Sequence, residues 1–239
     1  MYEMNVKTQA VLKRFSSLPS TNDYAKEKRK DGNDLIVIAR SQTGGRGTKG
    51  RSFSSEAGGL YVSKLTFYTD YPAKNAFRIM QNAAVAVCET VATFGISPTI
   101  KWPNDVYVNG KKICGILIEN ALCGGNISSS VVGIGVNVNN VLPADLIEIA
   151  TTIRGETGKT VALEKVEEIL LSFLEKDDLY LRYADWLGWL GERVDLLIGS
   201  QSLSVKFLAV TDEGHIVVET PTGVQTYASA EVRIKMRKN

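Results

Sequence analysis

The sequence predicts an α+β protein in which a part that mixes strands and helices precedes a small β-barrel. Strand and helix patterns are mixed up to about residue 190, and one helical pattern is long and amphipathic. The last stretch of about fifty residues consists instead of short β-branched runs divided by turns, which is typical of a small barrel. We therefore expect two domains, 1–190 and 191–239.

The first strand signal, Leu35–Ala39, leads into a loop of unusual composition at residues 41–51. This loop holds four glycines and three cations. Glycine lets backbone N–H groups approach a ligand, and Arg or Lys supplies charge to a phosphate or carboxylate. The loop differs from a P-loop because a second strand pattern, not a helix, follows it at residues 53–63. We expect it to bind an anion, the alternative being a solvated hairpin.

Three helices are predicted beyond this loop. Residues Pro72–Phe94 carry an apolar stripe at helical spacing, and Gly95 provides a stop. The stripe consists of Ala76, Ile79, Met80, Ala83, Val87 and Val91. Two further helices are expected over Pro143–Thr152 and Leu163–Leu187, and a strand over Val131–Val138.

A tight hairpin is predicted at Asn109-Gly110, because both central positions of a type I′ turn require a positive φ. Simple alternation along its return strand places Lys112 on the face of Cys114, and Lys111 on the face of Gly115. We expect Lys111 to be an exposed, solubilising residue. Lys112 has Asp105, the glycine loop and Gly115 nearby, so we expect it to be functional.

The C-terminal part contains five short strand patterns separated by turn residues. They are Val194–Ile198, Leu203–Val210, His215–Glu219, Val224–Tyr227 and Glu231–Met236.

Composition excludes several functional classes. A formal charge of +2 and the lack of a long basic run argue against a nucleic-acid partner, and the patch Lys26–Lys30 is interpreted as a solvated helix end. The single histidine, His215, argues against a catalytic triad or a zinc site. No run reaches the ~18 apolar residues of a membrane helix, and Met1–Met4 begin no apolar leader. Three cysteines without a C-x-x-C pattern indicate a reduced, cytoplasmic location.

Five motifs, taken in order, resemble those of biotin protein ligases. They are Ser20-Thr21-Asn22, Gln42 with Gly45-Arg46-Gly47, Lys101-Trp102-Pro103-Asn104-Asp105, Gly110 to Glu119, and Gly133-Ile134-Gly135-Val136-Asn137-Val138. The resemblance runs from about residue 16 to 139 and more loosely to the end. It implies a catalytic domain of the class II aminoacyl-tRNA synthetase and biotin synthetase type, with a mixed sheet flanked by helices, followed by a small SH3-like β-barrel.

The resemblance also implies an activity. Such enzymes activate biotin with ATP and Mg²⁺ to biotinyl-5′-adenylate, release pyrophosphate, and transfer biotin to a lysine of a biotin carrier domain of a carboxylase. Two anions meet in the first step, so fixed cations and N–H donors are needed where charge accumulates. Arg46, Lys112 and the glycine amides suit that role.

Site residues follow from the resemblance, position by position. Lys112 and Arg46 are the expected catalytic residues, and Asp105 is the expected Mg²⁺ ligand. The expected biotin-binding residues are Ser20, Thr21, Gln42, Gly45, Arg46, Lys112 and Gly115. The expected nucleotide-binding residues are Arg46, Thr48, Lys49, Trp102, Asn104, Lys112, Asn137 and, in preference to Arg233, Lys235.

The chain departs from several relatives at Thr48, where they have a second arginine. Lys49 or Arg51 is the candidate substitute, although alternation along an extended loop points Lys49 away from Thr48. The first motif begins after only nineteen residues, too few for a helix-turn-helix domain, so the resemblance is to the monofunctional kind.

Rival interpretations remain. A lipoate or octanoyl ligase would carry an Arg-rich Ser-Gly-Gly-Gly segment followed by a histidine, which is absent here. A non-catalytic regulator that binds biotin would require inert Arg46 or Lys112. The sequence does not identify the acceptor protein, and it leaves both monomer and homodimer open.

Overall fold

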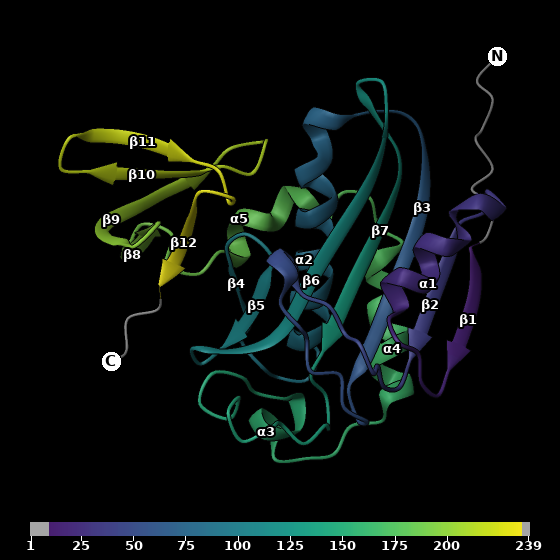
Figure 1. Ribbon diagram of the computed structural model, residues 1–239. Coiled ribbons are helices and arrows are strands. Elements are labelled where there is room, and N and C mark those ends of the chain that lie inside the picture. Colours follow the sequence, from purple (N-terminus) through teal and green to yellow (C-terminus); the bar gives the residue numbers. More distant parts are fainter. Residues whose placement is uncertain (1–9, 236–239) are drawn as a thin grey trace.

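The computed structural model describes residues 10–235, which form a seven-stranded sheet with helices and a separate five-stranded sheet (Figure 1). Two expectations concern residues outside this range: the missing leader at Met1–Met4 and the end of the last strand at Met236. None of the helices within the range is long and apolar enough to cross a membrane.

The large sheet has the strand order β1-β2-β3-β7-β6-β5-β4. Strands β1 and β2 pair in parallel and all other neighbours are antiparallel, so the predicted mixed sheet is confirmed. The strands are β1 (Val11–Phe15), β2 (Leu35–Ala39), β3 (Leu60–Pro72), β4 (Thr99–Lys101), β5 (Asp105–Val108), β6 (Lys111–Cys123) and β7 (Asn126–Val136). The hairpin between β5 and β6 turns at Asn109 and Gly110, whose φ angles are 49° and 77°.

Helices cover both faces of this sheet (Figure 1). On one face lie α2 (Ala76–Ala92) and α4 (Leu163–Leu174), followed by η4 (Leu179–Arg182) and α5 (Tyr183–Trp186). The other face carries α1 (Thr21–Glu27), which is continued by the turn η1 (Lys28–Asp31). A short helix α3 (Ile153–Thr157) lies between β7 and α4 in sequence.

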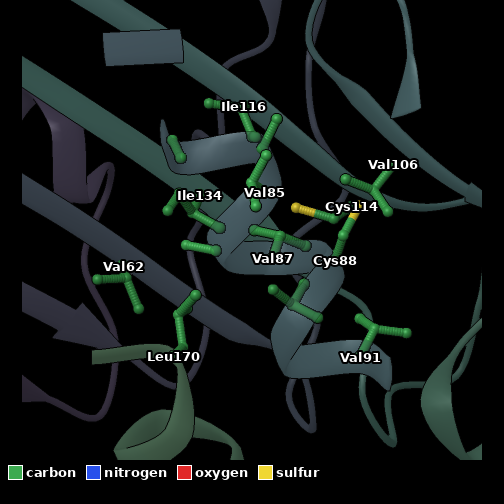
Figure 2. Packing of buried hydrophobic residues seen from close by; sticks show 14 of the residues in the cluster. Val62, Val85, Val87, Cys88, Val91, Val106, Cys114, Ile116, Ile134 and Leu170 are labelled. Atoms are coloured by element: carbon green, nitrogen blue, oxygen red, sulfur yellow. The ribbon is translucent and has the colours of Figure 1, made fainter. Parts of the chain in front are cut away.

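The main core lies between α2, α4 and the sheet. Figure 2 shows Val85, Val87, Cys88 and Val91 of α2 among side chains of the sheet such as Cys114. The predicted stripe is too narrow, because residues 83–88 are all at most 2% exposed. The helix is buried almost all round, since it lies between the sheet on one side and α4 with η4 on the other.

The predicted helix over Pro72–Phe94 starts too early. Strand β3 extends to Pro72, which pairs with Asn126 of β7, and Ala73 N–H donates to Gly125 O before the turn η3 (Ala73–Asn75) begins. The pairing of β3 with β7 thus delays the helix.

The helix predicted over Pro143–Thr152 is wrong. These residues form turns, and their backbone pairs with Lys112: Lys112 N–H donates to Ile149 O, and Thr151 N–H donates to Lys112 O. Helix α3 starts only after Thr152, whose hydroxyl caps it. Isolated turn bonds such as Ala150 N–H to Leu146 O remain, but pairing with Lys112 holds the segment to the sheet.

The helix predicted over Leu163–Leu187 is correct only to Leu174. Beyond it, the Asn82 side chain of α2 donates to Lys176 O and accepts from Tyr180 N–H. These two bonds satisfy backbone groups where the helix is interrupted, so the chain continues as η4 and α5.

The five predicted C-terminal strands are all present, in the antiparallel order β11-β10-β9-β8-β12. They are β8 (Arg193–Ile198), β9 (Gln201–Val210), β10 (Ile216–Thr220), β11 (Gly223–Tyr227) and β12 (Val232–Lys235). Their buried side chains, including Leu196 and Phe207, form a second core, which Trp102 enters from the β4–β5 turn.

Candidate active site

An inner cavity lies on the face of the sheet that carries α1, and glycines on β6 and β7 form its floor. A Cβ at Gly133 would lie 2.0 Å from Asn22 Oδ1, and one at Gly135 would lie 2.5 Å from the Phe53 ring. A Cβ at Gly115 would lie 3.0 Å from Lys112 Nζ. At Gly133 and Gly135 a Cβ would displace a side chain that lies directly on the sheet, and at Gly115 it would crowd Lys112 and Phe53.

Polar groups from α1 and the glycine loop form one wall of this cavity. The Ser20 hydroxyl caps α1 by accepting from Asp23 N–H, which fixes the start of the helix. Thr21 donates to Gln42 Oε1 through its backbone N–H, at 2.8 Å, and through its hydroxyl, at 3.0 Å. Gln42 Nε2 donates in turn to Ser55 Oγ. Ser20, Thr21 and Gln42 thus line the same cavity, and a hydrogen-bond network joins Thr21 to Gln42.

Gly45 supports this wall without contributing a side chain. Its carbonyl accepts from Phe53 N–H, and a Cβ there would lie 2.4 Å from Phe53 O and from Ser55 Oγ. The two ends of the glycine loop therefore approach each other closely at Gly45. The ring of Phe53, which sequence reasoning missed, covers Gly115 and Gly135 on the cavity floor.

Lys112 lies in the inner cavity between a carboxylate and an aromatic ring. Its Nζ is 2.7 Å from Asp105 Oδ1 and 5.6 Å from the centroid of Phe53. The predicted face was wrong, because Lys112 lies on the side of Gly115 and not on that of the buried Cys114.

A β-bulge explains this reversal. Tyr107 of β5 pairs with Lys112, whereas the preceding Val106 pairs with Cys114, so Ile113 is an extra residue in β6. One inserted residue shifts the alternation of side chains by one position. Lys111 points elsewhere, and its Nζ donates to Ile147 O at the surface.

We predicted an extended glycine loop near Thr48, and this prediction is wrong. Thr48–Gly50 form the 3₁₀ turn η2, in which Lys49 has a φ of 57°. Arg51 folds back and donates to Thr48 Oγ1 at 2.9 Å and to Thr48 O at 3.2 Å. Lys49 Nζ instead donates to Ser229 O and Ala230 O of the C-terminal part.

Arg46 lines the inner cavity and is held by two carboxylates. Its guanidinium is 2.7 Å from Glu119 Oε2 and 2.8 Å from Asp23 Oδ1. The basic patch Lys26–Lys30, at the end of α1 and in η1, is less solvated than predicted, because Lys26 pairs with Glu119 Oε1 and Arg29 donates to Glu119 O.

An outer cavity of about 390 Å³ adjoins the inner one and lies between the large sheet and the C-terminal strands. Both cavities share Thr48, Arg51, Asn104, Asp105 and Leu117 as lining residues. The outer cavity adds Lys49, Lys101 and Trp102 from one side, and Ser229 and Arg233 from the other.

Lys101 was missed by sequence reasoning. It pairs in register with Asp105, which pairs with Gly115, so Lys101 lies on the same face as the lining residues. Burial lowers the pKa of Lys101, and the nearby Asp105 only partly opposes this. The three-residue turn between Lys101 and Asp105 could have indicated their proximity.

Other predicted nucleotide-binding residues have structural contacts. The Trp102 indole is 3% exposed and donates to Gly214 O, and Asn104 Nδ2 donates to Ile116 O. Asn137 lines neither cavity and accepts from Asn140 Nδ2. Lys235 does not line the outer cavity, whereas Arg233 on the same strand does.

Comparison with known families agrees with this geometry. The model of the biotin/lipoate A/B protein ligase family matches residues 14–137, and that of the biotin protein ligase C terminal domain matches residues 189–234. The chain belongs to the biotin/lipoate A/B protein ligase family. The family models thus cover both the inner-cavity motifs and the five-stranded sheet.

Curated relatives belong to the same family. The chain is 32% identical over 218 residues to the bifunctional ligase/repressor BirA of Bacillus subtilis, covering 83% of this chain and 66% of that protein. It therefore spans just under two thirds of that relative's length. It is 32% identical over 215 residues to the biotin–[acetyl-CoA-carboxylase] ligase of Paracoccus denitrificans, covering 82% of this chain and 88% of the relative.

A solved structure shows the same fold over nearly the whole chain. The biotin protein ligase of Aquifex aeolicus in complex with biotin and ATP superposes with a TM-score of 0.78 and 27% identity. The match covers 95% of this chain and 99% of that one.

Proposed function

We propose that the protein is an ATP-dependent biotin protein ligase. It binds biotin in the inner cavity and ATP in the outer cavity, forms biotinyl-5′-adenylate with release of pyrophosphate, and transfers biotin to a lysine of a carrier domain. The observation that carries the proposal is Lys112, which lies in the inner cavity beside Asp105, a residue that lines both cavities.

In the first step the biotin carboxylate attacks the α-phosphorus of ATP, and the bond to the pyrophosphate group breaks. Negative charge accumulates where the two anions meet, so a cation fixed there before the reaction stabilises the transition state. Lys112 provides this cation, and its ion pair with Asp105 orients the ammonium group. Arg46 and Arg51 add positive charge at the wall of the inner cavity.

In the second step the amine of the acceptor lysine attacks the carbonyl carbon of the mixed anhydride. An amide forms, AMP leaves, and the amine loses a proton to solvent. The acceptor we propose is the biotin carrier domain of a carboxylase, and we place the protein in the cytoplasm. The three free cysteines Cys88, Cys114 and Cys123 support a reduced compartment.

Asp105 suits Mg²⁺ as a hard oxygen ligand, and Mg²⁺ would neutralise charge on the phosphates of ATP. Among residues 10–235 no group of three or more His, Cys, Asp or Glu side chains is placed to hold a metal. Asp105 therefore contributes one ligand at most beside the phosphates, and its main contact is Lys112.

Pyrophosphate release with biotin and with lipoate tests the proposal. Biotin carries a ureido ring that can hydrogen-bond to the wall of Ser20, Thr21 and Gln42, and lipoate lacks it. Each hydrogen bond between the ring and this wall contributes about 0.5–1.5 kcal/mol net, and lipoate forms none of them, so turnover should favour biotin. Equal turnover of the two acids would show that the assignment is wrong.

A further inference from the structure

Four charged side chains beside the inner cavity form a closed ring of ion pairs. Lys26 contacts Asp23 at 3.0 Å, and Asp23 contacts Arg46 at 2.8 Å. Arg46 contacts Glu119 at 2.7 Å, and Glu119 contacts Lys26 at 2.9 Å. The ring joins three segments that are far apart in sequence: α1, the glycine loop and β6.

Glu119 has a second function within this arrangement, because it also fixes the orientation of Asn22. Asn22 Nδ2 donates to Glu119 Oε2 at 3.0 Å, and Asn22 Oδ1 accepts from Ser63 Oγ. Ser63 Oγ is also 2.8 Å from Thr21 Oγ1, which bonds to Gln42. One carboxylate is therefore connected both to the cation of the loop and to the polar wall.

The surroundings of Glu119 favour its ionised form. Burial by itself would raise the pKa of this carboxyl, but hydrogen bonds from Lys26 and Asn22 and the charge of Arg46 outweigh it and lower the pKa. Its side chain is 24% exposed, and Glu119 lines neither the inner nor the outer cavity. It is therefore placed to act through Arg46 and Asn22, which do line the inner cavity.

We propose that Glu119 is a positioning residue for biotin activation, holding the glycine loop closed through Arg46 and the polar wall in place through Asn22. This inference rests on the proposed function. Partly exposed ion pairs contribute little to stability, so the ring affects the position of Arg46 more than the folding of the protein. Without the Glu119 charge the loop opens more often, and bound biotin must then close it.

The test is Glu119→Gln, which removes the charge and keeps the shape. We expect the KM for biotin to rise about tenfold with kcat changed less than about twofold, because saturating biotin closes the loop. Trypsin should cleave the loop at its cations about tenfold faster, and biotin should restore protection. The matched control is Glu164→Gln, whose side chain is 77% exposed and pairs with Arg40; neither residue lines the inner cavity.

Coupling to Arg46 distinguishes positioning from a general loss of structure. If Glu119 acts through Arg46, the effects of Glu119→Gln and Arg46→Ala on the KM for biotin should be clearly less than additive. If Glu119→Gln fails to fold, the same double-mutant cycle is measured with Asp23→Asn and Arg46→Ala. Asp23 is suitable because it is the other carboxylate that pairs with Arg46. Additive effects in either cycle contradict the proposal.

Two further results would overturn it: an unchanged KM for biotin with unchanged loop cleavage, or a fall in kcat with KM unchanged. Either leaves the proposed function intact, because the unmodified protein still releases pyrophosphate from biotin and ATP. Failure of the unmodified protein in that assay would instead overturn the proposed function, whereas trypsin cleavage tests the ring without any activity.

Discussion

Lys112 is a single residue whose function depends on its immediate contacts. Asp105 fixes the direction of its ammonium group, and the Phe53 ring lies within cation–π distance on the cavity floor. The neighbouring Lys111 has the same chemistry but bonds to a surface carbonyl of Ile147. The two lysines therefore form a matched pair for mutation.

We expect Lys112→Ala to lower adenylate formation by roughly 10²–10³-fold, the scale for loss of one preorganised electrostatic group. Lys111→Ala should leave the rate nearly unchanged. Quenched-flow measurement of adenylate with both variants tests this, with circular dichroism to verify folding. Similar losses in both variants would contradict the proposed role of Lys112.

Thr48 is the second position at which a residue-scale prediction is possible. An arginine there would add a charge-assisted hydrogen bond, so Thr48→Arg should slow release of preformed adenylate about tenfold or more. Lys49 is engaged with Ser229 O and Ala230 O, and Arg51 with Thr48 O and Thr48 Oγ1, so we expect neither to provide this hydrogen bond already. Rapid dilution measures the release rates. An unchanged release rate in Thr48→Arg, together with a much faster release rate in Lys49→Ala, would show that Lys49 already binds the adenylate at this place.

At the scale of elements, α1 lies close to the sheet because the facing residue of β7 is a glycine. Gly133 of β7 leaves room for Asn22, and Ala25 of the same helix packs on Val37 and Val131. The N-terminus of α1 can therefore approach the sheet closely enough to form the wall of the inner cavity.

Gly133→Ala should disturb both stability and biotin binding. A Cβ 2.0 Å from Asn22 Oδ1 forces the buried Asn22 side chain to move and to break its hydrogen bonds, and overpacking of this kind typically costs about 1–3 kcal/mol. Urea denaturation and biotin titration calorimetry measure the two effects. As a control, Gly125→Ala has open space around its Cβ and should change neither. Normal biotin affinity in Gly133→Ala would contradict the proposed wall.

The contact between α1, the glycine loop and β6 should also depend on pH. Burial raises the pKa of Glu119, but its hydrogen bonds and neighbouring cations lower it further, so the folded pKa is depressed. Its stabilisation is complete above the unfolded pKa, about 4.3, and is lost as the pH falls through the lower folded value. Urea unfolding between about pH 3 and 6 should therefore show a flatter acid dependence in Glu119→Gln. An identical slope in both proteins would exclude this contribution.

At the scale of the whole molecule, the two sheets are connected through aromatic contacts. Trp102 of the large sheet is buried in the second core, and Phe77 of α2 lies against Gly214, where a Cβ would be 2.3 Å from the ring. Lys49 adds a polar connection to the loop between β11 and β12. The outer cavity exists only because these contacts hold the two parts together.

Trp102→Ala should therefore weaken the contact between the large sheet and the C-terminal sheet. Truncation of a buried tryptophan typically costs about 3–5 kcal/mol and here would also loosen the C-terminal sheet. We expect a lower melting temperature and a larger loss of ATP affinity than of biotin affinity, because the inner cavity does not include Trp102. Calorimetry with each ligand checks this. Equal losses for both ligands would show that the two cavities are not separable in this way.

The sequence by itself determined the features that depend on local chemistry. The glycine loop, the Asn109-Gly110 turn, the five C-terminal strands and the motif around Lys112 follow from residue types and their spacing. Ser20, Thr21 and Gln42 could be grouped because the resemblance to biotin protein ligases joins their motifs.

Only the tertiary structure decided the features that depend on distant partners. The bulge at Ile113 turns Lys112 towards the cavity, and pairing with Lys112 prevents the helix expected over residues 143–152. Likewise, the insertion of Trp102 into the second core and the ring through Glu119 join segments remote in sequence. Local propensities contain no information on such contacts, because hydrogen bonds and buried area between remote segments arise only after the chain has folded.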